Sequence, residues 1–320
     1  MGPLDRLQGL LEGASSSTKL VMRLRRVGIE AQRHLVKASI FQRLHGVARQ
    51  QWRGGHAEPR RLRVLDIFAG AGGFSLGFQL SGCDVVGAVE IDEWAAETFR
   101  FNHPGTQVLT RDIQSVSDEE LQEIFLPTKP DIILGGPPCQ GYSLCLPNAG
   151  DPSDPRNTLF AEFLRIVRLF EPRLVVMENV PNIQTAFTLS GDLVINIIKQ
   201  ELVELGYDVH FQVLEATDFG IPQIRKRLFI VGSAKRLDAP FPSPSHCVVG
   251  EMPKLSSTEL VPCLSLWDAI SDLPPLQAGE GDERQAYASL PSNSYQALLR
   301  QSSHEVYNHT AMNHTPRIVE

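Results

Sequence analysis

The sequence RVLDIFAGAGGFSLGFQLSGCDVVGAVE, residues 63–90, decides the fold class. Its apolar run at 63–68 predicts a short buried strand, and a turn with three glycines separates this run from a helix-like stretch at 75–80. A second apolar strand is predicted at 84–89, and Glu90 follows it directly. This order of strand, glycine turn, helix and strand is typical of a βαβ unit in a parallel sheet.

The glycine turn also indicates a ligand. Glycines let a ligand approach the backbone at a helix N-terminus, and an acid about 20 residues further on can bind ribose hydroxyls. Ser75 occupies the position at which a dinucleotide fingerprint needs its third glycine. We therefore expect a nucleoside ligand without pyrophosphate, with S-adenosylmethionine as the main candidate. Taken alone, the turn also fits a purely structural role, since many α/β turns carry glycines.

The alternation of strands and helices continues along the chain. Helices are predicted at 118–125, 159–170 and 192–205, and strands at 131–134, 174–177, 208–214 and 228–232. The expected fold class is α/β, with a doubly wound, mostly parallel sheet of the Rossmann-like type. Ligands of such sheets bind at the C-terminal ends of the strands. The glycine turn should therefore converge on one crevice with Glu90, Asp112, Cys139 and Glu178.

Composition and charge limit the classes of function. The chain has 320 residues, of which 42% are hydrophobic and 21% charged, as in soluble globular proteins, and no apolar run approaches the roughly 20 residues of a membrane span. Residues 1–60 carry a net charge of +7 and the remainder −14. An acidic main part argues against tight nucleic-acid binding by that part alone. Residues 19–51 are expected to form amphipathic helices that pack on the main domain, contact a DNA backbone or serve as a transit peptide.

A second stretch, GGPPCQGYS at 135–143, places a cysteine behind two prolines and two glycines. Five cysteines without a CxxC pair indicate a reducing compartment, so Cys139 is expected to be a free thiol. Most free cysteines are small buried hydrophobic residues, but such a residue does not require this turn. A thiolate that adds to carbon 6 of cytosine makes carbon 5 nucleophilic, and an acid near ring N3 takes up the developing charge. Cys139 and Glu178 suit these two roles.

With these residues the chain resembles the DNA (cytosine-5)-methyltransferase family between about Arg63 and Gly232. The resemblance is specific because the matching blocks follow one another in the family's order. The blocks that match the cofactor site are Asp66–Phe74 for the cofactor loop, Glu90–Asp92 and Asp112–Ile113 for ribose and adenine, and Asn157–Phe160 for the cofactor lining. The blocks that match the catalytic site are Gly136–Ser143 for the nucleophile loop, Glu178–Val180 for the target base, and Gln223–Arg227 for the QxRxR block. Tyr142 stands in the nucleophile loop where Phe is common. The resemblance implies S-adenosylmethionine as cofactor and, as substrate, a cytosine flipped out of double-stranded DNA.

The resemblance also implies roles for individual residues. The catalytic residues would be Cys139, Glu178 and Arg225. Cofactor binding would involve Phe68, Ala69, Gly70, Gly72, Gly73, Glu90, Ile91, Asp112, Ile113, Pro137 and Leu159. DNA contacts or support of the loop would come from Gln140, Ser143, Arg156, Asn179, Gln223 and Arg227. No metal site is expected, since His309 and His314 are five residues apart and have no evident third ligand.

Three segments are expected along the chain. Residues 1–61 would form a basic, helical N-terminal extension and linker, residues 62–235 the S-adenosylmethionine-binding catalytic domain, and residues 236–320 a polar, Pro/Ser-rich connecting segment. The family's target-recognition region and last two motif blocks do not follow the QxRxR block. We therefore expect a separate recognition subunit or a downstream region to complete the enzyme and to supply positive charge for DNA.

The expected function is methyl transfer to carbon 5 of cytosine in DNA, within a restriction-modification system. One alternative is an RNA cytosine-5 methyltransferase that acts on tRNA, although Gln140–Ser143 argues against that branch. Another alternative is an inactive remnant that still binds the cofactor. The expected location is the bacterial cytoplasm, in association with the nucleoid, with no membrane partner.

Overall fold

The computed structural model describes residues 60–138, 159–248, 260–300 and 303–313. These residues belong to two compact units. The larger unit contains the described residues up to Ala216 together with Ile224–Ser243, and the smaller unit contains Thr217–Gln223 and the described residues from Pro244 onward.

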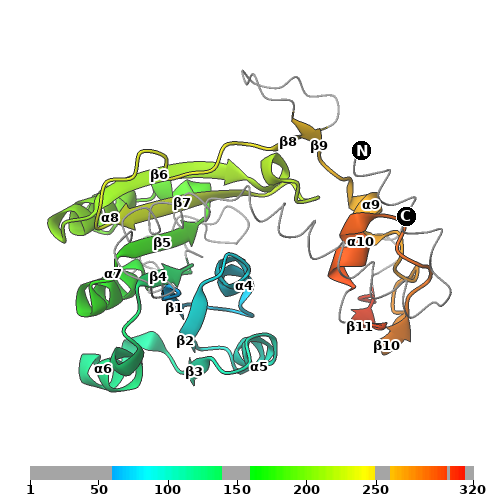
Figure 1. The fold of residues 1–320 in the computed structure, drawn as a ribbon, viewed down its shortest axis with the longest axis horizontal. Helices are drawn as coiled ribbons and strands as arrows, with labels where there is room; N and C mark the ends of the chain where they lie inside the picture. Colours follow the sequence, from blue (N-terminus) through cyan, green and yellow to red (C-terminus); the bar gives the residue numbers. More distant parts are fainter. Residues whose placement is uncertain (1–59, 139–158, 249–259, 301–302, 314–320) are drawn as a thin grey trace. The chain divides into compact units, whose positions relative to one another are not determined.

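The larger unit is built on a seven-stranded sheet with the strand order β3-β2-β1-β4-β5-β7-β6 (Figure 1). Neighbouring strands from β3 to β5 pair in parallel, whereas β7 runs antiparallel to both β5 and β6. The sheet is therefore mostly parallel, which confirms the α/β class expected from the sequence. Its strands are β1 (Arg63–Ile67), β2 (Asp84–Glu90), β3 (Gln107–Thr110), β4 (Ile132–Gly135), β5 (Leu174–Asn179), β6 (Asp208–Glu215) and β7 (Lys226–Ser233).

Helices cover both faces of this sheet (Figure 1). One face carries α4 (Gly73–Leu80) and α5 (Glu93–Asn102), and the other carries α6 (Asp118–Phe125), α7 (Leu159–Phe170) and α8 (Val194–Glu204). Successive strand residues point to opposite faces. Val64 accordingly lies in one buried cluster with Phe78 of α4, and Leu65 lies in another with Phe163 of α7. Short 3-10 helices complete the unit: η1 (Ile113–Ser115), η2 (Leu126–Thr128), η5 (Pro181–Thr185) and η6 (Ala216–Phe219), the last of which continues into the smaller unit.

Side chains at helix N-termini fix where two of these helices begin. The Asp92 carboxylate accepts a hydrogen bond from the Ala95 amide at 2.8 Å, at the start of α5. The Ser117 hydroxyl accepts one from the Glu120 amide at 3.2 Å, at the start of α6. Each bond satisfies an amide that has no partner within its own helix. The chain therefore turns away from the sheet at a defined point shortly after β2 and β3 end.

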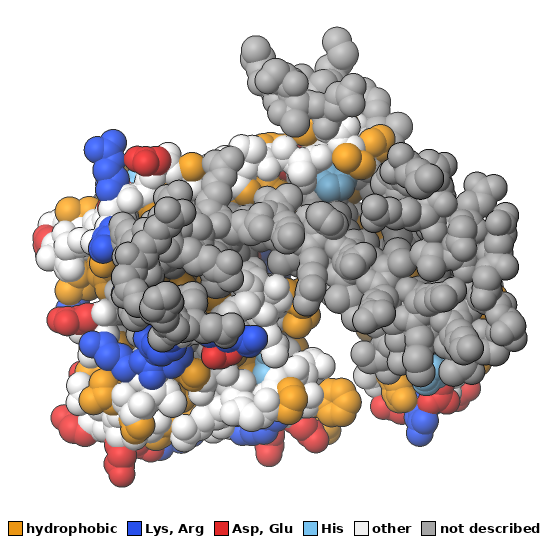
Figure 2. Space-filling view, viewed as in Figure 1, with side chains coloured by type: hydrophobic (Ala, Val, Ile, Leu, Met, Phe, Trp, Pro, Cys, Tyr) orange, Lys and Arg blue, Asp and Glu red, His pale blue; other side chains and the backbone are white. Residues whose placement is uncertain are grey.

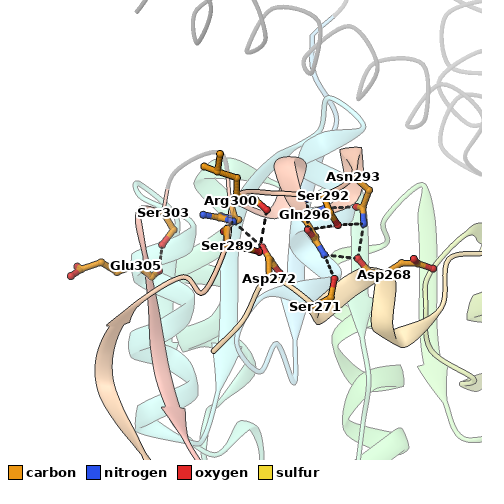
Figure 3. Close-up of polar contacts among 11 residues, drawn as sticks. Asp268, Ser271, Asp272, Ser289, Ser292, Asn293, Gln296, Arg300, Ser303 and Glu305 are labelled. Atoms are coloured by element: carbon orange, nitrogen blue, oxygen red, sulfur yellow. Dashed lines mark hydrogen bonds and ion pairs between the residues drawn. The ribbon is translucent and has the colours of Figure 1, made fainter. Parts of the chain in front are cut away.

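The smaller unit contains more regular structure than its Pro/Ser-rich composition indicates. A buried polar network holds its two helices together (Figure 3). The Gln296 side chain is buried and donates to the Asp268 carbonyl at 2.8 Å and to the Ser271 hydroxyl at 2.9 Å, while Arg300 pairs with buried Asp272 at 3.1 Å. The elements are β8 (His246–Cys247), β9 (Val261–Pro262), α9 (Leu266–Ile270), β10 (Gly281–Ala286), α10 (Ser294–Leu299) and β11 (Glu305–Thr310), and β10 pairs antiparallel with β11.

The surface of the larger unit has a local excess of acidic groups. Acidic side chains project near α6 (Figure 2), whose first turn contains Asp118, Glu119 and Glu120. Two of these carboxylates are paired with arginines, Asp118 with Arg165 and Glu120 with Arg111. Within the described ranges, no helix is both long enough and apolar enough to cross a membrane, and no group of three or more His, Cys, Asp and Glu side chains is arranged to hold a metal ion.

Candidate active site

The strand register brings the predicted site residues to one edge of the sheet. Val89, Ile67, Gly135 and Met177 occupy one row across β2, β1, β4 and β5. The residues that directly follow this row in the sequence therefore lie at the C-terminal edge of the sheet, and they are Glu90, Phe68, Gly136 and Glu178. This row is a direct consequence of parallel pairing, because the strands all end on the same side. Among the described residues, Glu90 and Glu178 therefore lie at the same edge of the sheet as the start of the glycine turn.

The glycine turn leaves β1 in an unusual backbone conformation. Phe68, Gly70 and Gly72 have φ values of 59°, 55° and 88°. The left-handed region is costly for an aromatic residue such as Phe68, and such strained residues cluster at functional sites. Gly72 caps the N-terminus of α4, next to exposed Gly73, and the amide of buried Ala69 donates to the Val89 carbonyl at 3.2 Å. The turn therefore presents a helix N-terminus at the edge where ligands of such sheets bind.

Glu90 joins this turn to the start of the next helix. Its carboxylate accepts a hydrogen bond from the Gly70 amide at 2.7 Å through Oε2, and one from the Asp92 amide at 2.9 Å through Oε1. Each carboxylate oxygen has two lone pairs, so both oxygens can accept a further bond from a ligand hydroxyl. Ile91, the next residue, is 64% exposed. Glu90 therefore offers hydrogen-bond acceptors in a fixed position, and Ile91 offers an accessible apolar side chain next to them in the sequence.

Asp112 and Ile113 follow the neighbouring strand β3. Asp112 caps η1 by accepting a hydrogen bond from the Gln114 amide at 3.0 Å, and its carbonyl accepts bonds from Ser115. Asp112 is half-buried and Ile113 is buried. Leu159, a further predicted cofactor residue, is half-buried at the start of α7.

Glu178 is the ionisable group at the end of β5. The Arg227 Nε lies 2.8 Å from its Oε1. Burial raises the pKa of Glu178 above its ordinary value, while Arg227 and, more weakly, Arg225 oppose this rise. Arg227, which the sequence assigned to the loop or DNA, is thus the arginine that contacts the carboxylate, and Arg225 is exposed and acts at longer range. A carboxyl group whose pKa is raised by burial and lowered by neighbouring arginines is suited to exchange a proton with a substrate.

The segment after β4 lies close to Glu178. A β-carbon on Gly136 would be 3.2 Å from the Glu178 Oε2, so a glycine leaves room for the carboxylate. Buried Asn179 donates from Nδ2 to the Pro137 carbonyl at 3.1 Å. The path of the chain toward the nucleophile loop is therefore fixed by the strand that carries Glu178.

Several predicted site residues cannot be placed in this geometry. Gln223 is exposed and belongs to the smaller unit. Cys139, Gln140, Ser143 and Arg156 lie outside the described residues.

Two buried polar groups beneath the glycine turn were not among the predicted site residues. The Ser75 hydroxyl donates to the Asp66 carboxylate at 2.6 Å, and burial raises the pKa of Asp66 to about 7. His103 donates from Nε2 to the Gly72 carbonyl at 3.0 Å and packs against Phe99. A lone carboxylate in an apolar strand was a sequence signal for Asp66, whereas nothing in the sequence pointed to His103.

Comparison with known proteins identifies the family and supports the fold. The family model described as C-5 cytosine-specific DNA methylase matches residues 62–315. The chain belongs to this family. This methylase family is the one that the ordered sequence blocks resembled, so the resemblance is confirmed.

Individual relatives of this methylase chain carry names from DNA modification. The chain is 42% identical over 259 residues to the Type II methyltransferase M.DdeI of Desulfomicrobium norvegicum, a match that covers 81% of this chain and 60% of the relative. It is 36% identical over 222 residues to the Type II methyltransferase M.AquIA of a Picosynechococcus strain, covering 67% of this chain and 89% of that protein. The chain spans about three fifths of the length of the first curated relatives it matches.

A solved structure supports the same fold assignment. It is an E. coli prophage protein provisionally identified as a DNA modification methyltransferase. The two are 26% identical with a TM-score of 0.58, and the match covers 80% of this chain and 73% of the other.

Proposed function

We propose that this methylase transfers a methyl group from S-adenosylmethionine to carbon 5 of cytosine in double-stranded DNA, through a covalent bond to Cys139. The observation that carries the proposal is the Glu178–Arg227 pair at the end of β5, where Glu178 lies beside Gly136. Cys139 follows Gly136 by three residues in the sequence. An acid with a raised pKa beside Gly136 supports Cys139, further along the same segment, as the proposed nucleophile.

The residues around the glycine turn fit an adenosyl ligand. Glu90 is held by two backbone amides and retains acceptor capacity for ribose hydroxyls, while exposed Ile91 offers an apolar surface for adenine. The side chain of Asp112, at the neighbouring strand end, would accept a hydrogen bond from the adenine amino group. Phe68, Leu159 and the turn residues would complete the lining. S-adenosylmethionine bound there would supply an electrophilic methyl group for carbon 5.

Cys139 and Glu178 would carry the chemistry on the base. The Cys139 thiolate adds to carbon 6, and the electron pair of the C5–C6 double bond becomes available at carbon 5. Glu178 holds ring N3 by a proton and so stabilises the negative charge that the addition places on the ring. Transfer of the methyl group to carbon 5 would leave S-adenosylhomocysteine as the second product. A solvent water then accepts the carbon-5 proton, the electron pair of that C–H bond re-forms the C5–C6 double bond, and the bond between carbon 6 and sulfur breaks with its electron pair on sulfur, which restores the thiolate.

Two of the described cysteines, Cys83 and Cys263, differ from the thiol that this reaction needs. Burial raises the pKa of Cys83 to about 11 and also raises that of Cys263. A nucleophilic cysteine needs a lowered pKa and access to substrate. This contrast supports Cys139, behind its two prolines, as the reactive thiol.

The remaining predicted residues would bind DNA or support the loop. Asn179 braces Pro137, and Arg225 would reach the flipped base or the DNA from an exposed position. Gln140, Ser143, Arg156 and Gln223 remain proposed DNA or loop contacts. A flipped-out base is required because carbon 5 and carbon 6 are stacked inside the duplex.

We further propose that the enzyme works in the cytoplasm, near the nucleoid, in a restriction-modification system and together with a separate recognition subunit. In this assignment residues 62–235 form the catalytic domain, residues 236–320 lead toward the recognition region and residues 1–61 are a basic extension. The names of the Type II relatives support the restriction-modification setting, and the match to M.AquIA covers 89% of that protein. The net charge of −14 over residues 61–320 supports a separate source of positive charge.

The test is transfer of a radiolabelled methyl group to unmethylated genomic DNA and, in parallel, to tRNA. The chain should be assayed alone and with the polypeptide encoded beside it. We expect label on carbon 5 of cytosine in DNA, and Glu178→Gln should lower the transfer rate by about 10²–10⁴-fold while cofactor binding persists. Label in tRNA alone would favour the RNA enzyme. Cofactor binding with no transfer under any condition would favour an inactive remnant.

A further inference from the structure

The guanidinium of Arg165, on α7, donates hydrogen bonds to four oxygen atoms. One belongs to its own helix and the others to two neighbouring segments, α6 and the turn at η1. Its Nε donates to Glu162 at 2.8 Å, and its Nη1 donates to Asp118 at the start of α6. Its Nη2 donates to the carbonyls of Ile113 at 3.0 Å and Val116 at 3.3 Å. The side chain is only 25% exposed. This guanidinium is therefore a partly buried junction between α7, α6 and η1.

The two carbonyls that Arg165 binds belong to the short turn that begins at Asp112. η1 has only three residues, and its first end is fixed by the bond from the Gln114 amide to the Asp112 carboxylate. Arg165 binds the carbonyl groups of Ile113 and Val116, which lie within this turn and directly after it. Among the described residues, no hydrogen bond engages Asp112 Oδ2. The turn is thus braced from both ends, and the Asp112 side chain caps it through Oδ1.

We propose that Arg165 is a positioning residue for adenine recognition, an inference that rests on the proposed function. By holding the carbonyls of Ile113 and Val116, Arg165 fixes η1 and so fixes the direction of the Asp112 carboxylate. A carboxylate accepts a hydrogen bond from the amino group of adenine but cannot accept one from the carbonyl oxygen of hypoxanthine. Arg165 therefore governs how well the site distinguishes these two bases, without contacting either.

The geometry requires arginine rather than a positive charge alone. A guanidinium presents five donors in a rigid planar fork, whereas a lysine has one compact ammonium group on a flexible stem. Arg165→Lys would keep a cation beside Asp118 and Glu162 but could not hold both carbonyls at the same time. This substitution therefore distinguishes the effect of the guanidinium's hydrogen-bond geometry from the effect of its positive charge.

The chain also offers a matched control on the same helix. Arg168 lies one turn further along α7 and forms an exposed ion pair with Glu201 of α8. Arg168→Lys makes the same chemical change at a position that does not contact η1. Any general effect of replacing an α7 arginine by lysine should appear in both variants.

The experiment is calorimetric titration of the full chain with S-adenosylhomocysteine and with S-inosylhomocysteine, in which an oxygen replaces the 6-amino group. We expect the parent and Arg168→Lys to prefer the adenine ligand by about tenfold or more, the usual effect of losing a hydrogen bond to a charged group. In Arg165→Lys the preference should fall to about twofold or less. A purely structural role would weaken both ligands equally and leave the ratio unchanged, and that result would overturn the proposal.

Two further outcomes are decisive. If the parent binds neither ligand, the proposed function fails and the inference fails with it. If the parent discriminates and Arg165→Lys does so equally well, only the inference fails. Should Arg165→Lys not fold, as judged by circular dichroism, Asp118→Asn removes one anchor of the guanidinium, and an unchanged ratio in that variant would overturn the proposal.

Discussion

Replacing Gly72 by alanine is expected to destabilise the larger unit, because the glycine turn leaves no room for a β-carbon. Gly72 has a φ of 88°, and the left-handed conformation costs an L-residue roughly 1–2 kcal/mol. The β-carbon would lie 2.4 Å from Nε2 and 2.6 Å from Cδ2 of His103, which is buried against Phe99. Overpacking of this kind costs roughly 1–3 kcal/mol. The free energy of unfolding should therefore fall by about 2–5 kcal/mol.

Urea unfolding followed by circular dichroism measures this loss. Gly73→Ala is the matched control, since its β-carbon would meet nothing within 4 Å, and it should change the free energy of unfolding by about 0.5 kcal/mol or less. Adding His103→Ala to Gly72→Ala removes the two closest contacts, although Phe99 Cδ2 at 2.9 Å remains, so the two losses should be less than additive by roughly 0.5–3 kcal/mol. Equal stability of the Gly72→Ala and Gly73→Ala variants, or strict additivity in the double variant, would refute the reasoning.

Two further predictions concern carboxyl groups of the site. Burial raises the pKa of Asp66 to about 7, so its contribution to stability is present below pH 4 and is lost as the pH rises toward 7. The free energy of unfolding of the parent should therefore fall by up to about 1.4 kcal/mol per pH unit in this range because of Asp66, and Asp66→Asn should abolish this part of the fall. Parallel curves of stability against pH for parent and variant would contradict this. Arg227→Gln removes a group that lowers the pKa of Glu178, so the alkaline limb of the kcat/KM profile should move to higher pH, whereas Arg168→Gln should leave it in place. An unmoved alkaline limb in Arg227→Gln would exclude Glu178 as the group that titrates there.

Long periodic segments of the larger unit could be predicted from the sequence. The helix expected at 159–170 has these bounds in the structure, because five of its residues are buried at helical spacing. By contrast, the sequence pattern gave no bounds for α5 or β3. α5 buries only Ala96 and Phe99, and β3 has four residues, none of them fully buried. Periodicity gives little signal when an element contributes so few core positions.

The candidate site was predictable where it depends on strand ends and less so where it depends on side-chain contacts. Parallel pairing alone places Glu90 and Glu178 on the same edge of the sheet. Sequence reasoning could not determine that Arg227 rather than Arg225 contacts Glu178, since both belong to the same block and the choice depends on the pairing of β7 with β5. The order in the smaller unit was also not foreseen, because a polar network rather than an apolar stripe holds α9 and α10 together.

The most direct test of the proposed mechanism is covalent capture of the nucleophile. The chain would be incubated with S-adenosylmethionine and DNA in which every cytosine is 5-fluorocytosine, with and without the polypeptide encoded beside it, and then digested and analysed by mass spectrometry. Fluorine cannot leave carbon 5 as a proton does, so the adduct should persist, and we expect the added mass on the peptide containing Cys139 and none in Cys139→Ala. An adduct on another residue, or no adduct in a chain that binds S-adenosylhomocysteine and methylates ordinary DNA, would contradict the mechanism.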